Sequence, residues 1–220
     1  MTQIFHIHPD NPQPRLIKQA AALLASGAIA AVPTDSSYAL VCRLDDKSAA
    51  DALRRIRGVD DKHHLTLLCR DLSELANYAR VDNKQYRLLK AATPGPFTFI
   101  LDASKEVPRR VSHPSRKTIG LRVPDHRVLQ ALLEQHSAPL LATTLIAPNN
   151  SDDTGTGHIN QPLNDADEIR STLGHVLAAI VDAGACFQQP TTVVDLTGMS
   201  AGNAPVVVRL GRGDVAVLGL

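Results

Sequence analysis

The chain has 220 residues and a formal net charge of +1, with four phenylalanines, three tyrosines and no tryptophan. This length fits a single domain, residues 1–220, whose core must be built from valine, leucine, isoleucine and alanine. No apolar run of membrane-spanning length and no signal-peptide pattern are present, so we expect a cytoplasmic protein that is not a membrane protein. The three cysteines lie far apart in or beside apolar runs, which favours buried free thiols over disulfides, catalysis or a metal site.

Helix and strand patterns alternate along most of the chain. The first helix is predicted at residues 14–26, where Pro14 suits the first turn and Gly27 the C-terminal end. Two strands flank a polar segment at residues 33–37. Further helices are predicted at residues 48–57, 72–78, 83–91, 128–136 and 166–173, and further strands at residues 65–69, 97–101, 119–123, 140–145, 176–181, 192–196 and 205–210. This order indicates an α/β fold with a twisted mixed sheet and flanking helices.

Short polar side chains follow the first of these strands. Residues 34–37 (Thr-Asp-Ser-Ser) come directly after Pro33, and their composition also fits a plain turn. Ligands of open α/β sheets bind at strand ends, and hydroxyl pairs recur at two later strand ends, residues 143–144 and 191–192. We therefore treat these strand ends as a candidate site for a small molecule.

Charge is divided unevenly along the chain. Residues 1–127 hold twenty Lys or Arg against thirteen Asp or Glu, a net charge of +7. Residues 128–220 hold three against nine, a net charge of −6. This asymmetry suggests a surface that attracts anions, although it equally fits a well-solvated basic half. Charge alone does not distinguish a nucleotide from a nucleic acid.

The densest basic cluster contains Arg54, Arg55, Arg57 and Lys62, at and just after the end of one predicted helix. Positive side chains are favoured there by the helix dipole, which explains part of the pattern. The functional interpretation is phosphate binding, because a guanidinium group can hold a phosphate through paired hydrogen bonds.

Two further arginines lie within or at the end of apolar strand patterns. Arg122 follows Thr-Ile-Gly-Leu, and a buried arginine in such a strand needs either a carboxylate or an anionic ligand. Arg209 ends a run of three valines and precedes Gly211. It could bind a nucleotide or form a salt bridge with an aspartate such as Asp195.

Five motifs occur together in one order over nearly the whole chain. They are the Pro-Thr-Asp-Ser-Ser-Tyr segment at 33–38, Thr-Pro-Gly-Pro-Phe-Thr at 93–98, Thr-Ile-Gly-Leu-Arg-Val-Pro at 118–124, Pro-Leu-Leu-Ala-Thr-Thr at 139–144 and Pro-Thr-Thr-Val-Val-Asp at 190–195. Val-Val-Arg-Leu-Gly at 207–211 closes the series. In this order they resemble the YrdC/YciO family of threonylcarbamoyl-AMP synthases and their relatives. Residues 8–12 and 70–75 resemble the YciO branch more than the YrdC branch.

The resemblance implies roles for individual residues and a YrdC-like fold. The nucleotide would contact Arg55, Arg57, Thr118, Thr144 and Arg209, together with Lys62 from the basic cluster. The threonine substrate would contact Ser36, Arg122 and Thr191. The resemblance suggests no side-chain nucleophile, and the sequence contains no metal-ligand pattern.

Three positions depart from the family pattern. Arg55 stands where the family has a lysine, Ile146 replaces an asparagine, and Leu68 occupies a place where synthases can carry a histidine. A lost buried polar contact costs a site about 1–3 kcal/mol. The scaffold is therefore preserved better than the polar groups of the synthase.

The resemblance implies an enzyme that converts ATP, threonine and bicarbonate to threonylcarbamoyl-AMP and pyrophosphate, for tRNA modification. Mg²⁺ would accompany the nucleotide, and the departures predict weak or altered activity. The alternative is a factor that binds double-stranded RNA or tRNA without synthase activity, which the basic first half supports.

Overall fold

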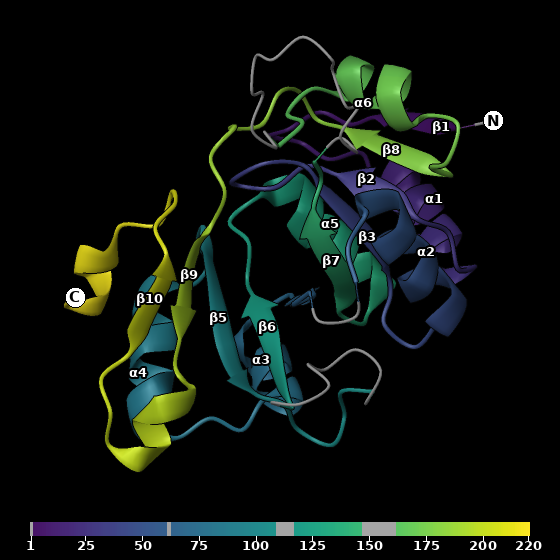
Figure 1. The fold of residues 1–220 in the computed structure, drawn as a ribbon. Coiled ribbons are helices and arrows are strands. Elements are labelled where there is room, and N and C mark those ends of the chain that lie inside the picture. Colours follow the sequence, from purple (N-terminus) through teal and green to yellow (C-terminus); the bar gives the residue numbers. More distant parts are fainter. Residues whose placement is uncertain (1, 61–62, 109–116, 147–161) are drawn as a thin grey trace, which may run out of the picture.

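The computed structural model describes residues 2–60, 63–108, 117–146 and 162–220, and its centre is a single mixed sheet of ten strands (Figure 1). The strand order is β1-β8-β2-β3-β7-β4-β6-β5-β9-β10. The strands are β1 (Gln3–His6), β2 (Ala30–Val32), β3 (Ala39–Arg43), β4 (Thr66–Leu68), β5 (Phe97–Asp102), β6 (Thr118–Arg122), β7 (Leu140–Thr144), β8 (Ala179–Asp182), β9 (Thr192–Asp195) and β10 (Val206–Arg209). Both parallel and antiparallel pairs occur along this order, which confirms the predicted mixed sheet.

Six α-helices flank the sheet, and each lies where the sequence predicts one. They are α1 (Pro14–Ala25), α2 (Lys47–Arg57), α3 (Leu72–Tyr78), α4 (Asn83–Ala92), α5 (Arg127–His136) and α6 (Ala166–Leu173). Their ends are set locally, since Asp46, Asp71 and Asp165 each accept a hydrogen bond from the first turn of the helix that follows. Two 3₁₀ helices, η1 (Thr197–Ala201) and η2 (Val215–Leu218), flank β10 in the sequence.

One strand was not expected from the sequence. β1 forms an edge of the sheet and pairs in parallel with β8, where Gln3 lies opposite Ala179. Only one of its four residues is buried, so its sequence lacks the apolar run that indicates a strand. A pairing partner more than 170 residues away supplies the hydrogen bonds that hold it extended.

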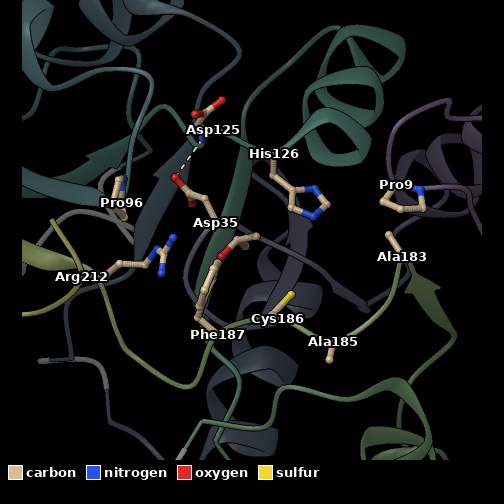
Figure 2. Close-up of a pocket in the computed structure, with 11 residues that line it drawn as sticks. Pro9, Asp35, Pro96, Asp125, His126, Ala183, Ala185, Cys186, Phe187 and Arg212 are labelled. Atoms are coloured by element: carbon tan, nitrogen blue, oxygen red, sulfur yellow. Dashed lines mark hydrogen bonds between the residues drawn. The ribbon is translucent and has the colours of Figure 1, made fainter.

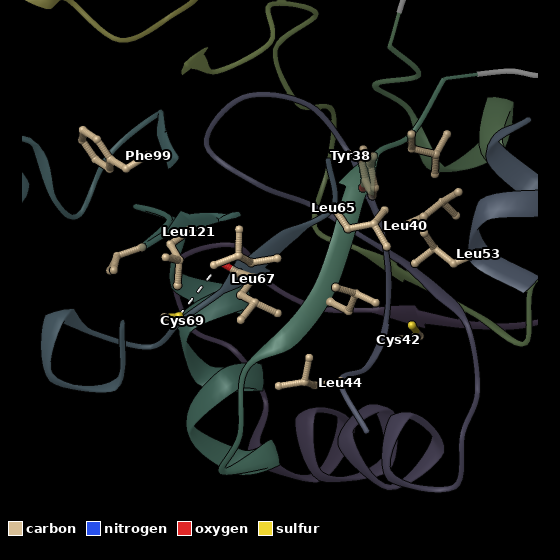
Figure 3. Packing of buried hydrophobic residues seen from close by; sticks show 14 of the residues in the cluster. Tyr38, Leu40, Cys42, Leu44, Leu53, Leu65, Leu67, Cys69, Phe99 and Leu121 are labelled. Carbon is tan, nitrogen blue, oxygen red and sulfur yellow. Dashed lines mark hydrogen bonds between the residues drawn. The ribbon is translucent and has the colours of Figure 1, made fainter. Parts of the chain in front are cut away.

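Buried apolar side chains form two clusters on opposite faces of the sheet, because successive residues of a strand point to opposite sides. Leu40 and Cys42 of β3 belong to the larger cluster, which includes Leu53 of α2 (Figure 3). Their neighbours on β3 belong to the smaller cluster, which α1 and α5 complete. In this cluster the helices pack with residues of β1, β8, β2, β3 and β7 and with Leu68 of β4.

Elsewhere this second face is open to a cavity, which residues of β3, β4, β5, β6, β7, β9 and β10 line. On β5, Phe97, Phe99 and Leu101 are buried in the larger core, whereas Thr98 and Ile100 point to the other side and line the cavity. Cys42 and Cys69 are fully buried free thiols and Cys186 is partly buried, as the sequence predicts. Among the described residues, no helix is long and apolar enough to cross a membrane.

Candidate functional site

The main candidate site is a cavity of about 870 Å³ over the open part of the sheet. This volume lies within the range of small-molecule sites. Side chains from seven strands and from the segment after α2 contribute to its wall. Five of the nine residues predicted to bind nucleotide or substrate line it: Arg57, Thr144, Arg122, Thr191 and Arg209. Arg122 and Arg209 thus face one cavity although they are 87 residues apart in the sequence.

Three of the other four predicted residues lie elsewhere. Ser36 is buried and contacts Arg122 rather than the cavity, with its hydroxyl oxygen accepting a hydrogen bond at 3.1 Å. Thr118 is buried, and its hydroxyl has no hydrogen-bond partner in the described part of the chain. Arg55 is exposed and does not line the cavity. Lys62 lies outside the described residues.

Arg122 forms a buried ion pair with Asp35, a residue to which the sequence assigns no role of its own. The side chains are 7% and 9% exposed, and the Nη2 group of Arg122 also donates to the Thr34 hydroxyl at 3.0 Å. The second carboxylate oxygen of Asp35 accepts from the Asp125 backbone amide at 2.9 Å. Arg122 Nε has no partner in the structure as described. The sequence predicts that Arg122 has either a carboxylate or an anionic ligand as its partner. The structure shows the carboxylate of Asp35 in that place.

Arg57 and Arg209 hold their charges without an acidic partner among the described residues. Arg57 Nε donates to the Thr144 carbonyl at 3.0 Å, and Arg209 donates to the Thr191 carbonyl at 3.0 and 3.2 Å. Arg209 therefore does not pair with Asp195, whose carboxylate accepts from Thr197 instead. Partial burial lowers the pKa of both guanidinium groups, which reflects the cost of holding a charge away from water.

Three cavity residues with titratable groups are absent from the predicted set. His63 and His64 follow the basic cluster, and their lack of metal spacing left them without a predicted role. His63 Nε2 lies 3.4 Å from the Thr143 hydroxyl. Tyr38 donates from its hydroxyl to the Gly184 carbonyl at 2.9 Å, and burial raises its pKa. The feature of the sequence that could have indicated a role for these histidines is their position shortly after Arg57.

Two of the departures from the family pattern also line this cavity. Leu68 at the end of β4 and Ile146 after β7 both contribute to its wall. The positions where the resemblance expects an imidazole and an amide are therefore apolar inside the site itself.

A second cavity of about 340 Å³ lies beside Asp35 (Figure 2). Its wall includes His126, Cys186 and Phe187, and the Arg212 guanidinium carbon lies 3.2 Å from the centre of the Phe187 ring. Burial raises the pKa of the Cys186 thiol to about 11, so this cysteine is protonated at neutral pH. Asp35 lines this cavity and Arg122 the larger one, so their ion pair lies between the two.

Known proteins resemble this chain over nearly its whole length. The protein YciO of Escherichia coli K12, which is uncharacterized, is 47% identical over 215 residues, 98% of each chain. The crystal structure of E. coli YciO matches with a TM-score of 0.89 at 46% identity, covering 99% of this chain and 100% of the other. The crystal structure of P. abyssi Sua5 complexed with L-threonine matches with a TM-score of 0.82 at 23% identity, which shows the same fold over 96% of this chain and 58% of that chain.

More distant similarity links the chain to an enzyme. Human threonylcarbamoyl-AMP synthase is 32% identical over 128 residues, which is 58% of this chain and 45% of that protein. The family model Sua5_yciO_yrdC, described as "Telomere recombination", matches residues 22–211. The resemblance seen in the sequence motifs is thus confirmed, and the chain belongs to the Sua5/YciO/YrdC family.

Proposed function

We propose that the large cavity binds ATP together with the carboxylate of an amino acid, and that the protein forms threonylcarbamoyl-AMP at a low rate. The observation that carries this proposal is the pair of cationic side chains, Arg57 and Arg209, that face the cavity without an acidic partner in the described structure. Uncompensated charge in a partly desolvated site favours an anionic ligand. The distant similarity to threonylcarbamoyl-AMP synthase and the L-threonine bound to P. abyssi Sua5 support this choice of substrate.

The chemistry of the proposed reaction suits this wall. A carbamate carboxylate would attack the α-phosphorus of ATP, and the arginines would stabilise negative charge on the pentavalent phosphate. No Asp or Glu is among the described residues that line the cavity, so bound Mg²⁺ would be held by the phosphate oxygens. When bound, Mg²⁺ would neutralise charge on the leaving pyrophosphate.

The apolar wall accounts for the low rate that we propose. Ile146 and Leu68 cannot form hydrogen bonds with a nucleotide, whereas an asparagine and a histidine could orient it. A displacement of about 1 Å of a reacting group can lower a rate about 100-fold. We therefore expect these apolar residues to lower the rate of the reaction more than they lower the affinity for ATP.

Replacing Arg57 with alanine should weaken ATP binding about 10- to 100-fold, because a hydrogen bond to a charged group contributes about 1.5–3 kcal/mol. Isothermal titration of ATP with Mg²⁺ measures this change. The matched control is Arg55→Ala on the same helix. Arg55 is exposed and lies outside the cavity wall, so this variant should bind ATP like the parent protein. Equal losses in the two variants would mean that general positive charge, and not this cavity, attracts the nucleotide.

A second candidate function is the binding of double-stranded RNA, which the net charge of +7 over residues 1–127 favours. If phosphate contacts dominate, log K should fall linearly with log salt concentration, with a slope of about −0.9 for each phosphate neutralised. Fluorescence anisotropy with an RNA duplex at several salt concentrations measures this slope. Arg109→Ala with Arg110→Ala should weaken binding for every duplex sequence alike; both arginines lie outside the described residues. A slope near zero would remove RNA as a direct partner.

A further inference from the structure

The large cavity contains few groups that could accept a proton. No carboxylate is among the described residues of its wall, and the arginines remain protonated. The Tyr38 hydroxyl is already bonded to the Gly184 carbonyl, and its raised pKa keeps it protonated at neutral pH. The hydroxyls of Thr98 and Thr191 bond to each other at 2.9 Å. Among the described wall residues, the remaining bases are the imidazoles of His63 and His64.

Hydrogen bonds hold the backbone of His63 in place, and the residue lines the cavity. Its backbone amide donates to the Asp60 carboxylate at 3.1 Å and to the Asp60 carbonyl at 3.3 Å. Its Nε2 lies 3.4 Å from the Thr143 hydroxyl, which is longer than a normal hydrogen bond. A bound amine could therefore replace this contact without a large loss. Arg57 lies at the same end of β7, where it donates to the next residue, Thr144.

The charges around His63 favour its neutral form. Partial burial and then the positive charge of Arg57 lower its pKa, and His64 and Arg54 act in the same direction. Asp60 opposes them. A histidine with a pKa below 6.5 is neutral at pH 7 and can accept a proton. Because residue 63 is also partly open to solvent, its imidazole can return that proton to water.

We propose that His63 is a catalytic base that takes a proton from the ammonium group of the amino-acid substrate; this inference rests on the proposed function of the cavity. The ammonium group gives one proton to His63 and becomes a nucleophilic amine. The nitrogen then attacks the carbon of bicarbonate and forms a C–N bond. The C–O bond to the departing hydroxide breaks, and hydroxide leaves as water with the second nitrogen proton. The products are a carbamate, water and one proton, which His63 passes to solvent.

This role agrees with the leucine at position 68. Leu68 lines the same cavity, and so the imidazole expected there is missing while His63 brings one into the same space from a different segment. His63 is separated from the end of α2 by only five residues, which brings it next to Arg57 at the proposed phosphate site.

The test compares His63→Gln with the parent protein in ATP binding and in pyrophosphate release with threonine and bicarbonate. Glutamine can still bond to Thr143 but cannot accept a proton at neutral pH. ATP affinity should remain that of the parent, whereas kcat at pH 7 should fall about 10²- to 10⁴-fold, the usual contribution of a general base. The parent rate should decline as the pH falls through the lowered pKa of His63, which lies below the ordinary histidine value, because the imidazole then becomes protonated. In the variant the rate should instead rise steadily towards pH 9, because the ammonium group of threonine then loses its proton to solvent without the help of a base.

Two histidine variants are the controls. His136→Gln removes another imidazole of lowered pKa at the end of α5, outside the cavity wall, and should leave turnover and its pH profile unchanged. A loss confined to His64→Gln, or a His63→Gln variant with the parent pH profile, would overturn the assignment of His63. A parent that binds ATP without any pyrophosphate release would also overturn it and leave nucleotide binding intact. A parent that binds no ATP would refute the proposed function itself.

Discussion

Replacing Asp35 with alanine should lower the free energy of unfolding by about 3–5 kcal/mol, the usual cost of removing one partner of a buried ion pair. Asp35 and Arg122 are both almost fully buried, and Asp35 also accepts from the Asp125 amide at 2.9 Å. The variant leaves the Arg122 charge with the Thr34 and Ser36 hydroxyls as its remaining partners on Nη2. Urea unfolding, monitored by circular dichroism, measures the change. The amplitude of the unfolding transition should shrink if the variant is already partly unfolded without urea.

A double-mutant cycle identifies the cause of that loss. Arg122→Leu with Asp35→Ala removes both charges, and replacing a buried ion pair by apolar groups is often nearly neutral. The double variant should therefore be at least as stable as Asp35→Ala alone, with a coupling energy of about 1 kcal/mol or more. Additive losses would show that the two side chains act independently, and that the stability comes from the turn at residues 34–37 itself.

Gly211→Ala should destabilise the protein by about 3 kcal/mol and weaken ATP binding. A Cβ atom at this position would lie 2.3 Å from the Pro190 carbonyl oxygen and 2.5 Å from backbone atoms of Thr191. These are backbone atoms, which cannot rotate aside, so the segment after β10 must move. We therefore place the loss of stability at the upper end of the usual cost of overpacking. The movement would also disturb the hydrogen bonds from Arg209 to Thr191.

Gly198→Ala in η1 is the matched control. A Cβ atom there would meet the Asn203 side chain at 3.3 Å, and a side chain can shift by a few tenths of an ångström. Thermal unfolding and ATP titration of both variants measure the contrast. If Gly211→Ala kept the parent stability and affinity, the close approach of residue 211 to residues 190–191 would not be needed to hold Arg209 at the cavity.

The sequence by itself determines most of the local elements of this protein, β1 excepted. Helices α3 (Leu72–Tyr78) and α6 (Ala166–Leu173) have the predicted bounds, because an aspartate before each one caps its first turn. Helix α1 begins at the predicted Pro14. The interior strands were also predictable from their apolar runs, which need two buried faces. Family membership followed from motifs that lie at the ends of these strands, and it is confirmed.

The wall of the cavity was only partly predictable. Arg55 and Arg57 belong to one basic cluster, but two residues along a helix turn the side-chain direction by about 200°. Local sequence shows that the two side chains face different ways, and it does not show which of them meets the cavity. Arg57 lines the cavity and Arg55 is exposed to solvent, because the sheet lies on one side of α2.

Tertiary structure alone decided which distant residues meet. Asp35 and Arg122 form their ion pair across 87 residues, and β1 is a strand because β8 lies beside it. His63 lines the cavity and meets Thr143 of β7, which lies 80 residues further along the chain. Helix caps and apolar periodicity act over a few residues, whereas these contacts depend on the strand order of the whole sheet. No short segment of the sequence contains that information.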